Sequence, residues 1–167
     1  MPVDTKAAPH RTLAFDSFDD IIADLNHIEA GITNGTAIHS GNWTIGQITD
    51  HCARFLAAAC DGFDKLAPAP VRWIARAVFY KKAVGPDPMP RGFKLPKSAI
   101  ALHPEPRISD AEGIDRLRKE LKRVLAGKPM NQPSALFGKL SHQEWDIIQR
   151  KHCAMHMGFI HPEGLDP

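Results

Sequence analysis

The chain has 167 residues, of which 43% are hydrophobic and 24% are charged, and its formal net charge is +2. This length suits one domain with its own core, and so small a net charge indicates neither a nucleic-acid partner nor a membrane-surface patch. No stretch approaches the roughly 18 apolar residues of a membrane span. The N-terminus also lacks the apolar region of a signal peptide, so we expect a cytoplasmic protein.

The chain divides into an N-terminal arm, residues 1–16, which we expect to be loose, and a single domain over residues 17–167. Its three cysteines, Cys52, Cys60 and Cys153, are odd in number and form no C-x-x-C pair. They therefore predict small buried side chains, rather than a disulfide framework or a cysteine-based zinc site.

A repeated start signal predicts four helices. In each case a Ser or Thr is followed three residues later by an acid or Gln, which is the pattern of a capping box. The four starts are Ser17, Thr44, Ser109 and Ser141. Apolar residues recur at helical spacing behind each start, and the expected ends are Gly31, Gly62, Gly127 and Pro162.

The connection between the second and third of these helices is different in character. Residues 71–82 predict a short helix that is both apolar and cationic, and the segment from Gly85 to Pro106 contains six prolines. That proline density excludes a regular helix there, and a loop of this length is usually functional or flexible. The predicted architecture is an all-α four-helix bundle with a long Pro-rich crossover between its second and third helices.

Three of the nine histidines are expected to face the core. His152 and His156 stand four residues apart, and therefore on one face of the last helix. His51 lies between Ile48 and Phe55 on the apolar stripe of the second helix. We expect the remaining histidines to be solvated; they are His10, His27, His39, His103, His142 and His161.

Three core-facing imidazoles are costly to bury unless each has a partner. One divalent metal ion held by His51, His152 and His156 would satisfy all three, and bundle cores are where such sites are built from facing helices. The alternative that stays open is that each ring is hydrogen-bonded to a carbonyl or carboxylate. The nearest acids, Asp50, Glu144 and Asp146, are expected to be solvated helix-face or capping residues, so no general base is predicted.

The segment Gly41-Asn42-Trp43-Thr44-Ile45-Gly46-Gln47-Ile48-Thr49-Asp50-His51 resembles the entry to the second helix of the DinB-like, YfiT-like metalloenzyme superfamily. His152 and His156 match the H-x-x-x-H of its last helix. Residues 91–98, 137–140 and 144–152 are similar to a subfamily without an assigned function. The resemblance implies a four-helix bundle, often a homodimer, in which the three histidines bind a divalent ion such as zinc or nickel.

Several functions follow from such a site. Three imidazoles leave a coordination position open, as in catalytic zinc sites, and the resemblance extends to thiol-dependent transferases. The first hypothesis is therefore a metal-dependent transferase or hydrolase that acts on a small molecule, with a low-molecular-weight thiol as a candidate partner. The alternatives are a non-catalytic stress-response or binding module with a structural or vestigial metal site, and a pure interaction protein.

Overall fold

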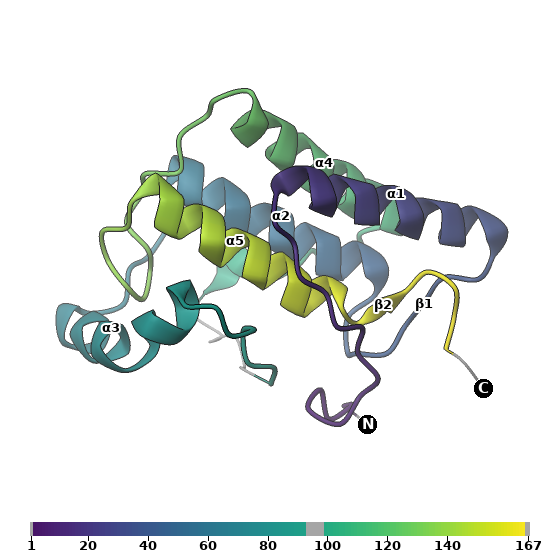
Figure 1. Cartoon of the computed structure of the whole chain (residues 1–167), viewed down its shortest axis with the longest axis horizontal. Helices are drawn as coiled ribbons and strands as arrows, with labels where there is room; N and C mark the ends of the chain where they lie inside the picture. Colours follow the sequence, from purple (N-terminus) through teal and green to yellow (C-terminus); the bar gives the residue numbers. More distant parts are fainter. Residues whose placement is uncertain (1, 93–98, 166–167) are drawn as a thin grey trace.

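The computed structural model describes residues 2–92 and 99–165, and these residues are mostly helical. They form five α-helices: α1 (Phe18–Asn34), α2 (Ile45–Asp61), α3 (Ala69–Val84), α4 (Asp110–Leu125) and α5 (His142–Met157). α1, α2, α4 and α5 run along the long axis of the molecule, whereas α3 lies apart from them below the N-terminal end of α5 (Figure 1). In the part of the chain that is described, no helix combines the length and the apolar character needed to span a membrane.

The four predicted helix starts are confirmed, and each is a complete capping box. The Ser or Thr side chain accepts the backbone N–H three residues later, and the side chain at that position accepts the N–H of the cap. The cap residues are Ser17, Thr44, Ser109 and Ser141. Each capping box satisfies two backbone N–H groups that would otherwise lack a partner. Because these contacts are local, the start signals could be read directly from the sequence.

Two of the predicted helix ends are wrong. α1 continues past Gly31 to Asn34 and closes on Gly35, whose φ of 73° is the left-handed cap. Gly31 serves close packing instead, because a Cβ at that position would lie 2.3 Å from the carbonyl oxygen of Pro162. α5 ends at Met157 rather than near Pro162.

A small two-stranded sheet, which the sequence did not indicate, follows α5. β2 (Ile160–His161) pairs antiparallel with β1 (Ile38–His39), with Ile38 opposite His161 and His39 opposite Ile160. The Thr36 hydroxyl also donates to the Pro162 carbonyl at 2.6 Å. These contacts fasten the end of α5 to the connection between α1 and α2.

The core lies between α1, α2, α4 and α5, and its most extensive helix pair is α2 with α4. Two glycines allow these helices to approach closely. A Cβ on Gly46 would lie 2.4 Å from the carbonyl oxygen of Ser109, and one on Gly113 would lie 2.2 Å from the carbonyl oxygen of Gly46. The largest fully buried side chains include Ile21, Leu25, Ile28, Ile48, Leu56, Ile114, Leu117, Leu121, Trp145 and Ile148.

α3 is longer than the predicted 71–82 helix and is attached to α5 by polar contacts. The Tyr80 hydroxyl donates to Glu144, and the Lys151 ammonium donates to the carbonyl oxygens of Lys82 and Gly85 at 2.6 and 2.9 Å. Lys151 therefore caps the C-terminal end of α3. Beyond α3 the crossover contains a short 3-10 helix, η1 (Ile100–Leu102). Residues 93–98, most of one of the three segments on which the expected subfamily resemblance rests, lie outside the described residues.

The N-terminal segment, which we expected to be a loose arm, packs on the helices in this structure. Ala8 and Phe15 are buried. The guanidinium of Arg11 forms two hydrogen bonds with the Asp24 carboxylate, at 2.8 and 2.9 Å, and the Arg11 N–H donates to the Gly158 carbonyl at 2.7 Å. The division of the chain into an arm and one domain stays a prediction.

Candidate metal centre

The structure brings together the three histidines that the sequence singled out. His51 comes from the middle of α2, and His152 and His156 come from the last two turns of α5. One ring nitrogen of each can be chosen so that all three atoms lie within 4.8 Å of one another. Bound zinc places imidazole nitrogens at about 2.0–2.1 Å, so donor atoms gathered on this scale could hold one metal ion.

The orientation of the His51 ring is fixed by the end of the crossover. Its Nδ1 lies 2.6 Å from the carbonyl oxygen of Leu102, in η1. A carbonyl only accepts, so Nδ1 carries the proton and Nε2 keeps its lone pair for a ligand. This is the outer contact that metal-binding histidines typically make, and it sets both the tautomer and the ring plane.

Aromatic side chains surround the other two rings. Trp43 lies directly before the cap of α2, stacks on His156 at 5.6 Å between ring centroids and contacts His51 at 4.9 Å. Phe55 packs on His152 at 4.2 Å. These contacts leave His51 and His152 buried and His156 half-buried. Trp43 therefore forms one wall of the site.

Burial keeps all three imidazoles neutral. It lowers the pKa of His51 from 6.5 to about 4, although the hydrogen bond to Leu102 acts in the opposite direction. Burial also lowers the pKa values of His152 and His156 well below the ordinary value, and their histidine neighbours lower them further. A neutral imidazole is the form that binds a metal, so the cluster is prepared for a cation at neutral pH.

One buried atom tests whether a metal fits here. Nδ1 of His152 is buried and has no hydrogen-bond partner among the residues that the structure describes. An unpaired buried nitrogen costs about 1–3 kcal/mol, and native proteins rarely leave one without a reason. Together with three neutral nitrogen donors, this atom fits a site whose remaining partner is a cation.

Asp50 is not the solvated acid that we expected. Its side chain is buried between two arginines, with Arg54 Nε at 2.8 Å and a guanidinium nitrogen of Arg116 at 2.9 Å. Its Oδ2 also accepts the backbone N–H of Glu105 at 2.8 Å. Burial raises the pKa of Asp50, but these three donors outweigh it and lower the pKa overall. Asp50 therefore clamps the crossover, whose Leu102 carbonyl orients His51.

The remaining histidines are not all solvated. His161 is buried and lies within 3.1 Å of the Ser40 hydroxyl. His10 places Nε2 2.8 Å from the Met155 carbonyl oxygen. Neither belongs to the cluster of possible metal ligands found among the described residues. His27, His39 and His142 are exposed, as the sequence predicted.

The three cysteines are buried and free, which confirms their prediction. Cys52 and Cys153 each follow a histidine of the cluster, and their thiols hydrogen-bond to each other. That contact, together with burial, raises the pKa of Cys52 well above its ordinary value. Buried thiols that hydrogen-bond to each other are packing groups.

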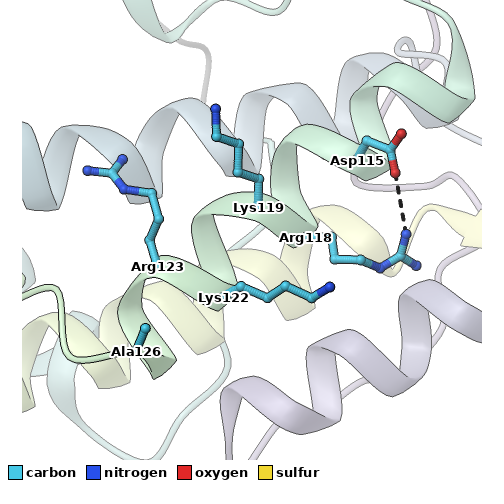
Figure 2. Close-up of a pocket in the computed structure, with 6 residues that line it drawn as sticks. All are labelled: Asp115, Arg118, Lys119, Lys122, Arg123 and Ala126. Atoms are coloured by element: carbon cyan, nitrogen blue, oxygen red, sulfur yellow. Dashed lines mark ion pairs between the residues drawn. The ribbon is translucent and has the colours of Figure 1, made fainter.

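A second surface feature is a basic depression on α4 (Figure 2), lined by Asp115, Arg118, Lys119, Lys122, Arg123 and Ala126. Its arginines are already paired, Arg118 with Glu29 at 2.5 Å and Arg123 with Asp61 at 3.0 Å. The ammonium groups of Lys119 and Lys122 point in different directions (Figure 2). These charges do not converge on one point, so we do not assign a ligand to this surface.

Comparison with known proteins gives one family. No curated protein and no solved structure matches the chain. A family model described as "Protein of unknown function (DUF1569)" matches residues 7–163, which is almost the whole chain and includes all three histidines of the cluster. The chain therefore belongs to the DUF1569 family of proteins of unknown function.

Proposed function

We propose that this protein binds a divalent metal ion through His51, His152 and His156, and that it does so on a four-helix bundle of the DinB-like kind. The observation that carries the proposal is the convergence of three neutral imidazoles from α2 and α5 within 4.8 Å, at a point where Nδ1 of His152 lacks a partner. The packing of α1, α2, α4 and α5 around one core supports the bundle.

The donor set narrows the choice of metal. Imidazole nitrogens suit zinc, nickel, copper and iron, whereas magnesium and calcium prefer oxygen ligands. We propose zinc or nickel as the resident ion. When bound, such an ion supplies Lewis-acid activation of a small molecule at its open coordination position.

The surroundings of the histidines favour transfer from a thiol over hydrolysis. Hydrolysis needs a base that takes a proton from water, but Asp50, the carboxylate next to His51 in the chain, is held by Arg54, Arg116 and the Glu105 N–H. A thiol needs less help, because it ionises far more readily than water. We therefore propose a metal-dependent transferase that uses a low-molecular-weight thiol. A cytoplasmic location and a homodimer remain part of this proposal.

Elemental analysis tests the metal site directly. Protein purified without a histidine tag is compared with the triple variant His51→Ala, His152→Ala, His156→Ala and with a control triple variant, His27→Ala, His39→Ala, His142→Ala. The control removes the same number of histidines from exposed positions. We expect about one zinc or nickel ion per chain in the wild type and the control, and none in the site variant.

Absence of metal from the wild type, even after it is reloaded with zinc and with nickel, would overturn the proposed metal site and leave a non-catalytic binding module. A bound ion without turnover of thiol and electrophile would retain the site and reject the transferase. The two parts of the proposal can therefore fail separately.

A further inference from the structure

Among the described residues, α3 carries five of the exposed large apolar side chains. Val71, Ile74 and Val78 stand at i, i+3 and i+7 on one face of α3; Ile74 is 64% exposed, and Val71 and Val78 are about half exposed. Trp73, which is 83% exposed, lies at the edge of this face. Soluble monomers rarely leave so many large apolar side chains together on one helix, and such a patch marks an interaction site.

The opposite side of α3 explains why this face is free. Arg76 donates to the carbonyl oxygens of Phe137 and Lys139 at 2.8 and 3.2 Å, and Tyr80 donates to Glu144. α3 is therefore held to the body by polar contacts on its inner side. Its outer side protrudes from the edge of the molecule (Figure 1).

The charge around this face has one sign. α3 contains Arg72, Arg76, Lys81 and Lys82 and no acidic residue. Lys81 and Lys82 follow Val78 by three and four residues, so they lie at the C-terminal end of the same face. From Lys65 to Arg91 the chain carries six basic residues and only one acid, Asp87. The net charge of +2 averages this segment with a more acidic remainder.

We infer that the outer face of α3 docks on an anionic lipid surface. A convex helix that presents Trp, Ile and Val beside lysines has the composition of a helix lying in a membrane interface, where Trp is favoured and lysine stems extend along the apolar layer. Anionic headgroups supply the negative charge with which the lysines can pair. A second copy docked through the same face would place its lysines against these lysines, so it matches this surface less well.

This inference does not depend on the metal site, and it replaces our expectation that the protein has no membrane contact. It is tested by sedimentation of the full chain with vesicles of phosphatidylcholine alone or mixed with phosphatidylglycerol, at low and high salt. We expect binding only to the mixed vesicles, and weaker binding at high salt. The tryptophan emission should shift to shorter wavelength on binding and should lose this shift when Trp73 is replaced, because Trp145 is fully buried and Trp43 packs against the core.

Matched variants give the test its specificity. Trp73→Ser with Ile74→Ser, and Lys81→Glu with Lys82→Glu, should each lower vesicle binding about tenfold or more. Leu125→Ser, and Lys119→Glu with Lys122→Glu, make the same kinds of change at exposed positions of α4 and should leave binding within about twofold. All variants should keep the metal content of the wild type.

Equal loss of binding in the α3 and α4 variants would overturn the inference, as would a wild type that binds neither kind of vesicle. If a wild type that ignores vesicles self-associates, and if Trp73→Ser with Ile74→Ser abolishes that association, the face belongs to a second copy instead. An acidic peptide that binds the wild type more tightly than the vesicles do would assign it to a protein partner.

Discussion

His51 shows how far a single residue's surroundings decide its chemistry. It stands next to Asp50 in the sequence, yet one side chain is an imidazole kept neutral by burial and the other is a carboxylate kept charged by Arg54 and Arg116. Their directions around α2 differ by about 100°. His51 therefore faces the cluster while Asp50 holds the crossover, and the two act on the same site from different sides.

The metal-free protein should become less stable as the pH falls from about 6.5 to about 4. The pKa of His51 is about 4 in the folded protein, against an ordinary value of 6.5, so in this window the unfolded chain binds a proton that the folded chain does not. His51 alone should contribute a loss of about 3 kcal/mol in the free energy of unfolding. The measurement is urea unfolding in chelator across this pH range.

His51→Asn is the control for that experiment, because its amide can still donate to Leu102 but does not titrate. The wild type should lose about 3 kcal/mol more than this variant over the same pH window. Parallel curves for the two proteins would show that His51 titrates normally and is not buried as described.

At the scale of elements, the contact between α2 and α4 depends on the absence of side chains. Gly113 meets the backbone of Gly46, and α4 contributes Ile114, Leu117 and Leu121 to the core beside that contact. The same face of α2 then positions Asp50 against Arg116 of α4. A shift of α4 would therefore move the clamp that holds Leu102 against His51.

Gly113→Ala tests this packing by the sign of its effect. In a free helix, Ala is about 1 kcal/mol more favourable than Gly, so propensity alone predicts stabilisation. The structure predicts the opposite, because the new Cβ would lie 2.2 Å from the Gly46 carbonyl oxygen. We expect a loss of about 1–3 kcal/mol in urea unfolding. Stabilisation by Gly113→Ala would show that the two helices do not approach so closely.

At the scale of the whole molecule, the candidate site joins parts that are distant in the chain. It combines α2, α5 and η1, and the sheet of β1 and β2 ties down the chain just beyond His156. Unfolding separates α2 from α5, so a ligand held by both helices binds only the folded chain. Such a ligand stabilises the fold by mass action.

Zinc or nickel should therefore raise the melting temperature. A free metal concentration one hundred times Kd adds about 2.7 kcal/mol, which corresponds to about 5–11 °C for a chain of this size. Calorimetry with added metal and with chelator measures the difference, and the His51, His152, His156 triple alanine variant should show none. An equal melting temperature with metal and with chelator in the wild type would contradict a metal bound across α2 and α5.

The sequence by itself determined the features that are encoded locally. Each capping box lies within four residues and each apolar stripe repeats along one helix, so the starts of α1, α2, α4 and α5 were predictable. The pairing of His152 with His156 was predictable for the same reason, since a helix fixes the direction of residues four apart. The inward direction of His51 followed from its place on an apolar stripe.

The tertiary structure decided everything that depends on contacts between distant segments. Gly31 could be read as a helix stop because its real partner, Pro162, comes from the other end of the chain. Asp50 could be read as solvated because Glu105 and Arg116, which bury it, belong to the crossover and α4. The β1–β2 pair and the exposed face of α3 could not be predicted from the sequence for the same reason. Strand pairing and exposure are properties of packed elements that no local pattern specifies.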